Sequence, residues 1–189
     1  MINTLRKSVG AGFLIGISGY ISLMCDNKYI SAILFSIGLY TICVYGLKLY
    51  TGMSGYICEC LNRNYPTILG ITLLGNVIGC SLIAIFPLPQ DVFLELQLMI
   101  SQKSIYTSAY ESFLCGCLMF IAVDSYRKYR TPIGIFLAVP AFILSGMEHS
   151  IANTYYLLAS RQWAFIPIVL ICVVGNTLGS ILTNELIAD

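Results

Sequence analysis

Glu148, His149 and Asn153 place chemically active side chains in an almost wholly apolar part of the chain. They lie in GMEHSIANTYY, residues 146–156, between the apolar stretches PIGIFLAVPAFILS and WAFIPIVLICVVG. His149 is the single histidine of the sequence. A neutral imidazole can donate a hydrogen bond, accept one or relay a proton, and a protonated imidazole can hold an anion. Ionisable residues in such surroundings are costly and usually functional, so we expect His149 to act on a solute rather than serve as a hydrogen-bonded core histidine.

A second polar stretch, YGLKLYTGMSG (45–55), lies one hundred residues before the first. Both stretches interrupt long apolar segments with Gly, Thr, Ser or Asn, which is typical of a helix that breaks within a membrane. Transporters with inverted repeats place their sites at such breaks, near the bilayer midplane. We therefore expect residues 49–54 and 149–154 to leave regular helical geometry and to face each other across a narrow passage.

Composition identifies the surroundings of these residues. The apolar fraction is 58% and only 10% of residues are charged, whereas a soluble domain has nearer a quarter of its residues charged. The chain is therefore expected to be an integral membrane protein with the lipid bilayer as its partner. A net charge of +1 argues against a nucleic-acid partner. No cofactor is expected, and the C-x-C pair at Cys58 and Cys60 lacks the spacing of a zinc site, so no metal is expected either.

Hydropathy predicts an all-α protein with six transmembrane helices, since a span needs about 20 mostly apolar residues. The polar breaks between the spans are short, except for the third, where DVFLELQLMI predicts a short helix at the membrane interface. The six spans cover about 8–25, 30–50, 65–87, 104–126, 132–159 and 162–186.

The sequence also repeats itself. A shift of one hundred residues superimposes Gly16 on Gly116 and G-N-x-x-G at 75–79 on the same motif at 175–179, in a register predicted to hold without a gap. We expect one transmembrane domain, 1–189, with halves at about 1–89 and 101–189. Because three helices per half is an odd number, the repeat is inverted. Basic residues in the loops divide six against three in favour of cytoplasmic N- and C-termini.

The glycines of the repeated motif are predicted to be structural. G-x-x-x-G spacing lets two helix backbones approach closely. This interpretation covers Gly75, Asn76, Gly79, Gly175, Asn176 and Gly179.

Three segments resemble the formate/nitrite transporter family. GMEHSIANTYY resembles the G-F-E-H-S-I-A-N-M segment of that family's fifth helix, and GLKLYTG (46–52) resembles the G-A-E-L-F-T-G loop of its second helix. FLCGCLMFIAV (113–123) resembles the fourth-helix segment I-L-C-N-W-L-V-C-L-A-V. The resemblance implies an aquaporin-like inverted 3+3 repeat with broken second and fifth helices. It also implies a homo-pentamer with one pore per protomer in the cytoplasmic membrane.

The resemblance further implies an activity: passage of small monovalent anions of weak acids, such as formate, nitrite or hydrosulfide, or of the neutral acid. By motif, His149 is the central pore histidine and Thr51 the loop threonine that faces it, with Asn153 close to the histidine. Lys103 is a candidate for the lysine of the extracellular vestibule. Leu49 and Tyr50 belong to the loop of Thr51, and the apolar residues that narrow the pore are Phe35, Leu39, Met119 and Phe142.

Two residues depart from the family pattern: Lys48 stands where the family has glutamate, and Gly116 where it has asparagine. Lys48 and Glu148 occupy equivalent positions of the two halves. We expect Lys48 to pair with Glu148, to brace its own helix break or to line the pore; a snorkelling lysine is the fourth reading. Glu148 is expected to be structural, with its carboxylate accepting backbone N–H groups freed by the break.

Other classes of function fit the residues less well. An aquaporin-like channel for small neutral solutes would share the fold, but the paired Asn-Pro-Ala motifs of that class are missing from the sequence. A membrane enzyme would need a second catalytic group beside His149, and the adjacent Glu148 points about 100° away on a regular helix. We therefore predict a channel or transporter, not an enzyme.

Overall fold

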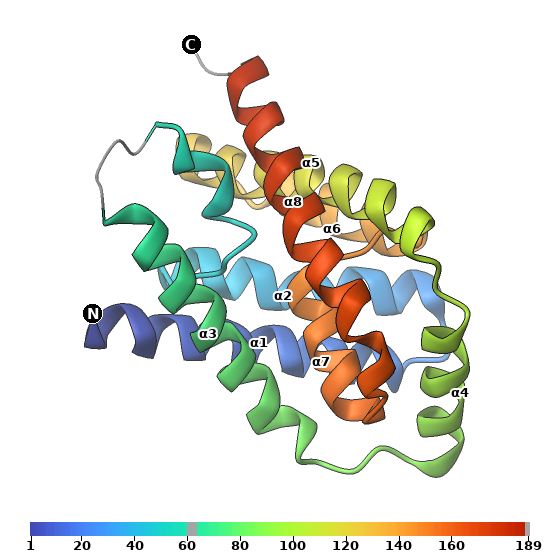
Figure 1. Ribbon diagram of the computed structural model, residues 1–189. Coiled ribbons are helices and arrows are strands. Elements are labelled where there is room, and N and C mark those ends of the chain that lie inside the picture. Colours follow the sequence, from blue (N-terminus) through green and yellow to red (C-terminus); the bar gives the residue numbers. More distant parts are fainter. Residues whose placement is uncertain (60–63, 188–189) are drawn as a thin grey trace.

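The computed structural model describes residues 1–59 and 64–187, and its regular structure is entirely helical over these ranges (Figure 1). Most boundaries of the predicted spans lie within a few residues of a helix end. In chain order the helices are α1 (Ile2–Leu23), α2 (Lys28–Val44), the 3-10 helix η1 (Ser54–Ile57), α3 (Tyr65–Ala84), α4 (Gln90–Ser101), α5 (Ile105–Tyr129), α6 (Ile133–Leu144), α7 (Ser150–Ser160), the 3-10 helix η2 (Trp163–Phe165) and α8 (Ile166–Ile187).

Three of the described helical segments are long and apolar enough to cross a membrane by themselves: Tyr65–Ala84, Ile105–Tyr129 and Trp163–Ile187. The apolar helices α2 and α6 are shorter, because each is cut by a break. On α8, Leu170, Val174 and Leu178 are each more than half exposed and lie one turn apart. A row of exposed apolar side chains on an apolar helix is what a lipid-facing surface requires.

Close helix pairs form the frame. α3 crosses α1, and α8 crosses α5 (Figure 1). A Cβ on Gly79 would lie 2.2 Å from the carbonyl oxygen of Val9, and one on Gly179 would lie 2.0 Å from that of Phe113. These backbones therefore touch at positions where only glycine fits.

The contacts of these pairs correct the register of the repeat. A Cβ on Gly12 would lie 2.0 Å from the carbonyl oxygen of Asn76, and one on Gly116 would lie 2.2 Å from that of Asn176. Gly12, not Gly16, is therefore the counterpart of Gly116. The shift of one hundred residues without a gap misplaces the first helix by four residues. That alignment is wrong in the first helix because residues four apart lie on the same helix face, so a shift of one turn leaves an apolar pattern nearly unchanged.

Both long spans are broken. After α2, residues 45–53 form a loop before η1, and after α6, residues 145–149 form a loop before α7. Gly46 (φ +58°) and Gly146 (φ +71°) take the left-handed conformation directly after the two helices, which glycine adopts without strain. The expectation that 149–154 is irregular is wrong, because His149 is the N-cap of α7 and helix resumes at Ser150.

The short helix predicted after the third span is α4. This helix packs against α7, and its own side chains Leu96 and Ile100 are buried. Gln97 binds the loop after α7 twice: its side chain donates to the Ser160 carbonyl at 3.1 Å, and its carbonyl accepts from the Gln162 side chain at 3.0 Å. These bonds tie the segment that carries Lys103 to the second broken helix.

Candidate functional site

The two breaks meet at Thr51 and His149. The Thr51 hydroxyl lies 3.0 Å from His149 Nε2, and both residues are buried. Each comes from the loop that interrupts one long span, so the contact forms only when both halves are folded together. The predicted pairing of these two residues is thus a direct contact in the structure.

The histidine tautomer follows from its second nitrogen. The backbone N–H of Ala152 donates to His149 Nδ1 at 3.1 Å, which makes the imidazole the N-cap acceptor of α7. An accepting Nδ1 carries no proton, so the neutral ring carries its hydrogen on Nε2 and donates it to the Thr51 oxygen. The Thr51 hydroxyl hydrogen is then available for another acceptor.

Two asparagines hold the breaks in place. The Asn176 oxygen accepts from Ser150 N–H at 2.7 Å, while its amide donates to the carbonyls of Ser112 (2.7 Å) and Glu148 (2.9 Å). These groups belong to α5, α7 and the loop before α7. One side chain on α8 therefore binds two backbone groups at the break, those of Glu148 and Ser150, and joins them to the backbone of α5.

Asn76 does the same in the first half. Its oxygen accepts from Tyr50 N–H at 2.8 Å, and its amide donates to the carbonyls of Ser8 (2.8 Å) and Lys48 (2.9 Å). The repeated motif predicts that both asparagines, like its glycines, are structural residues at a close helix contact. Their bonds give them a further task, which is to position the loops that carry Thr51 and His149.

Aromatic side chains cover one side of the histidine. The Phe142 ring stacks on the imidazole, with centroids 5.6 Å apart and planes 22° apart, and the Phe35 ring meets Phe142 edge-on at 6.0 Å. These residues, with His149, line a cavity of about 160 Å³, named here the His149 cavity. The two phenylalanine rings therefore make the wall of this cavity apolar beside His149.

An ion pair lies in the wall of the His149 cavity. Lys103 Nζ binds the Glu148 carboxylate, and the Asn153 amide donates to the same carboxylate. The Lys48–Glu148 pair is therefore wrong, because the Glu148 side chain faces Lys103. The expectation that this carboxylate accepts freed backbone N–H groups is also wrong, since Asn176 accepts from Ser150 instead.

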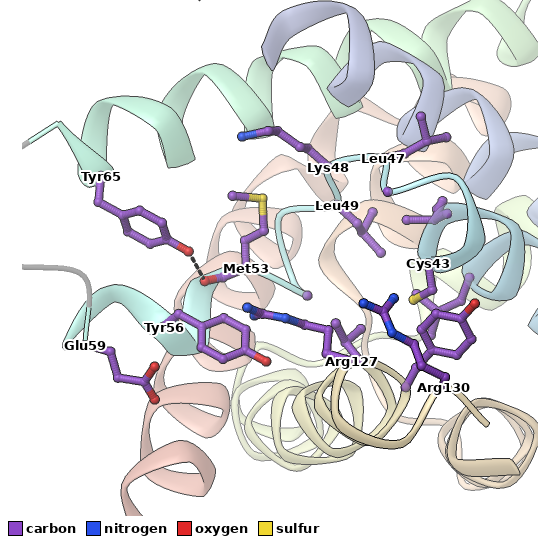
Figure 2. A pocket seen from close by; sticks show the side chains of 16 residues that line it. Cys43, Leu47, Lys48, Leu49, Met53, Tyr56, Glu59, Tyr65, Arg127 and Arg130 are labelled. Atoms are coloured by element: carbon purple, nitrogen blue, oxygen red, sulfur yellow. Dashed lines mark hydrogen bonds between the residues drawn. The ribbon is translucent and has the colours of Figure 1, made fainter. Parts of the chain in front are cut away.

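A larger cavity of about 540 Å³, named here the Arg127 cavity, lies on the other side of the first break (Figure 2). Its wall includes Lys48 and Leu49 of the loop and Arg127 and Arg130 at the end of α5. Of the four alternatives for Lys48, pairing with Glu148 is excluded, and the side chain lies in the wall of this cavity. From the sequence, the two arginines count only toward the charge of a loop. Their spacing of three residues is the feature that could have predicted a shared helix face.

The remaining predicted residues divide between the two cavities. Leu39 lines the Arg127 cavity, whereas Phe35, one helical turn away, lines the His149 cavity. The constriction between the cavities thus lies at this turn of α2, beside Thr51 and His149. Three predicted residues are missing from the described residues that line the two cavities: Thr51, Met119 and Tyr50. Thr51 is buried in its contact with His149, Met119 is buried in the core, and the Tyr50 hydroxyl lies 2.8 Å from that of Thr177.

Within residues 1–59 and 64–187, no three His, Cys, Asp or Glu side chains are grouped so that they could hold a metal ion. The side chains that the site does offer are hydrogen-bond donors and cations. The donors are an imidazole, a hydroxyl and an amide, and the cations are Lys103 on one side and Lys48, Arg127 and Arg130 on the other.

Comparison with known proteins agrees with this geometry. The profile of a family described as Formate/nitrite transporter matches residues 1–188. The formate-nitrite transporter of Plasmodium falciparum (isolate 3D7) is 24% identical over 198 residues, which cover 82% of this chain; the chain spans 64% of the length of that relative.

Two solved structures share the fold. A structure described as an FNT family ion channel matches with a TM-score of 0.78 and 21% identity, over 96% of this chain and 85% of that one. A pentameric formate channel with formate bound matches with a TM-score of 0.79 and 18% identity, over 98% and 93% of the two chains. Because the family profile covers nearly the whole sequence, the chain belongs to the formate/nitrite transporter family, a family of multi-pass membrane transporters and not of enzymes, as its motifs predicted.

Proposed function

We propose that the protein conducts small monovalent anions of weak acids, of the formate, nitrite or hydrosulfide type, through a pore in each protomer. The observation that carries this proposal is the buried contact between Thr51 and His149, at 3.0 Å, with one cavity on each side. A relative known as a formate channel with formate bound supports the substrate class.

The donors at the constriction suit an anion. Moving an unpaired anion from water into an apolar constriction costs roughly several kcal/mol of hydration free energy, whereas moving the neutral acid costs far less. The Nε2–H of His149 donates to the Thr51 oxygen, and the hydroxyl hydrogen of Thr51 then supplies a hydrogen bond to a carboxylate or nitrite oxygen as it leaves water. The solute then crosses either as the neutral acid or as the anion, with its negative charge stabilised by this hydrogen bond.

The tautomer of His149 limits its part in proton transfer. A neutral imidazole that gave up its Nε2 proton would become an imidazolate, so lending a proton requires a ring protonated at both nitrogens. Protonation of Nδ1 would set two hydrogens against each other, because Ala152 N–H already donates there. The geometry therefore supports a histidine that stays neutral and donates a hydrogen bond, with the proton of the neutral acid coming from the solution.

Lys103 supplies the positive charge of the His149 cavity. Its side chain is 26% exposed, whereas that of Glu148 is 3% exposed. The lysine therefore keeps contact with water while its partner is enclosed. In this position it raises the local concentration of anions at one mouth of the path, while Glu148 and Asn153 keep it from binding an anion too tightly.

The assembly and topology belong to the same proposal. The protein is a homo-pentamer in the cytoplasmic membrane, with both termini in the cytoplasm and halves of 1–89 and 101–189 related as an inverted repeat. The matched bonds of Asn76 and Asn176 support the repeat, and the pentameric relative supports the assembly. The charge bias of the loops supports the orientation.

Flux through proteoliposomes tests the proposal. We expect purified protein to carry formate, nitrite or hydrosulfide and to exclude glycerol, which an aquaporin-like channel for neutral solutes would pass. His149→Phe should reduce the anion flux, and Arg161→Asn, a change outside both cavities, should leave it unaltered. Glycerol flux without anion flux would overturn the proposal in favour of a neutral-solute channel.

A further inference from the structure

The Arg127 cavity holds more positive charge than passage of a small monovalent anion requires. Lys48 lies in its wall on the loop of residues 45–53, and Arg127 and Arg130 lie across from it, at the end of α5, as Figure 2 shows. Lys7 does not line the cavity, but its ammonium donates at 3.1 Å to the carbonyl of Gly46, which does. Among the described residues of the wall, Glu59 is the single carboxylate.

The acidic groups near these cations already have partners. Glu59 accepts a hydrogen bond from the Asn184 amide. Asp124 accepts from the Tyr56 hydroxyl at 2.9 Å and pairs with Lys128 at 3.2 Å. In the part of the chain that the structure describes, neither the Lys48 ammonium nor the Arg130 guanidinium has a carboxylate within ion-pair distance.

Arg127 is held in an aromatic setting. Its guanidinium lies 4.1 Å from the centre of the Tyr56 ring, in a cation–π contact that leaves the N–H groups at its edge available. A guanidinium presents these groups as a rigid fork that matches the oxygens of phosphate, sulfate or carboxylate. Two such forks and an ammonium around one cavity suit an anion with several oxygens and more than one charge.

The size of the cavity agrees with such an occupant. A volume of 540 Å³ far exceeds the roughly 30 Å³ that one water molecule takes up in the liquid. The cavity therefore has room for a tetrahedral oxyanion together with its waters. The His149 cavity, at about 160 Å³, is smaller and has one lysine that is already paired.

We propose that the Arg127 cavity is a binding site for a divalent tetrahedral oxyanion, such as sulfate, phosphate or a phosphomonoester, held by Lys48, Arg127 and Arg130. Such an ion enters the cavity and stops there. The hydration lost in the apolar constriction rises with the square of the charge, and a single proton leaves a divalent ion still charged. The bound ion therefore occludes the path of the monovalent solute. Binding is independent of the proposed function, whereas occlusion rests on it.

Equilibrium dialysis with radiolabelled sulfate tests the binding directly. Sulfate and perchlorate share the tetrahedral shape and differ in charge, so we expect purified protein to bind sulfate saturably and perchlorate to compete poorly. Lys48→Gln together with Arg130→Asn should weaken sulfate binding by about tenfold or more, equivalent to about 1.4 kcal/mol. Inorganic phosphate and glycerol phosphate, added as competitors, distinguish the free ion from a phosphomonoester as the preferred ligand.

Arg161→Asn is the matched control. Arg130 (φ 56°) and Arg161 (φ 57°) both end a helix in the left-handed conformation, which Asn tolerates, but only Arg130 lines the cavity. Full sulfate affinity in the Arg161 variant and weakened affinity in the Lys48/Arg130 variant would support the site. Equal affinity in both variants, or equal competition by perchlorate, would overturn it.

Flux measurements separate the site from the transport function. In proteoliposomes with sulfate on both sides, formate flux through the wild-type protein should fall as sulfate is raised at constant ionic strength. Flux through the Lys48/Arg130 variant should resist sulfate. Binding without any effect on flux would overturn the occlusion, and absent formate flux in the wild type would refute the proposed function while the dialysis result still decides the site.

Discussion

Thr51 Oγ1 and His149 Nε2 lie 3.0 Å apart although 98 residues separate them in the chain. The contact joins the loop after α2 to the N-cap residue of α7. Asn76 accepts a hydrogen bond from the backbone N–H just before Thr51, and Asn176 accepts one from the backbone N–H just after His149. Neither half can form it alone. The pore centre is therefore a product of how the two halves pack, and each of its parts can be removed separately.

The first prediction concerns the histidine ring. His149→Asn keeps an acceptor at the N-cap and an amide donor, whereas His149→Phe keeps neither. We expect formate flux to fall by about tenfold or more in the Phe variant, equivalent to about 1.4 kcal/mol on the barrier, and less in the Asn variant. Because the ring stays neutral, the Asn variant should keep the wild-type dependence on pH between about 5 and 8. A changed pH profile in that variant would show that the ring titrates during transport.

The second prediction concerns Thr51. Thr51→Val keeps the shape and removes the hydroxyl, which leaves the buried Nε2–H of His149 without an acceptor at a cost of about 1–3 kcal/mol. Thr51→Ser keeps the hydroxyl. Thermal unfolding in detergent should therefore show a lower midpoint for the Val variant and a smaller change for the Ser variant, with flux following the same order. Equal unfolding midpoints and equal flux in the two variants would show that this hydrogen bond contributes neither to stability nor to transport.

The third prediction concerns the ion pair of the His149 cavity. Lys103→Met leaves the Glu148 carboxylate buried with Asn153 alone, so we expect this variant to lose stability. Lys103→Met combined with Glu148→Gln removes both charges and should recover most of the loss. Stability measured by unfolding in detergent checks this, with Lys28→Met as the control for loss of a lysine outside both cavities. A double variant less stable than Lys103→Met alone would contradict the pairing.

The fourth prediction concerns the two asparagines that hold the breaks. Asn176→Leu removes three hydrogen bonds to buried backbone groups, each with a net contribution of about 1 kcal/mol. Asn76→Leu removes the equivalent three in the first half. Both variants should therefore assemble poorly, whereas Leu178→Ala on the exposed face of α8 should not. Normal assembly and flux in either asparagine variant would show that the loops hold their shape without these bonds.

The fifth prediction concerns the close helix pairs. Gly12→Ala and Gly116→Ala each place a methyl group within about 2 Å of a backbone oxygen, so the helices must separate. Gly70→Ala adds its methyl group to open space, with nothing within 4 Å. We expect the first two variants to yield little folded protein, by size-exclusion chromatography, and the third to resemble the wild type. A well-folded Gly12→Ala would contradict the register found for α1.

The sequence by itself determined the class of the protein and the centre of its site. Composition predicts a membrane protein, and polar residues inside two long apolar segments predict the two breaks. The resemblance of GMEHSIANTYY and GLKLYTG to the transporter family implied that Thr51 and His149 meet there. These inferences depend on residue type and local pattern, which a sequence states directly. The ends of the helices were not predicted from the sequence: α2 and α6 end before Gly46 and Gly146, within the spans expected at 30–50 and 132–159.

Tertiary structure decided the partners. Lys48 was predicted as a partner of Glu148 because the two residues occupy equivalent positions in the repeat. Side chains at a helix break do not follow the directions of a regular helix, and Glu148 pairs with Lys103 instead. The register of α1 against α3 depends on which glycine meets a backbone oxygen, and an apolar pattern tolerates a shift of one turn. The positive charge around the Arg127 cavity exists only because the end of α5 packs beside residues 45–53, a proximity of segments that are far apart in the chain and that no local pattern encodes.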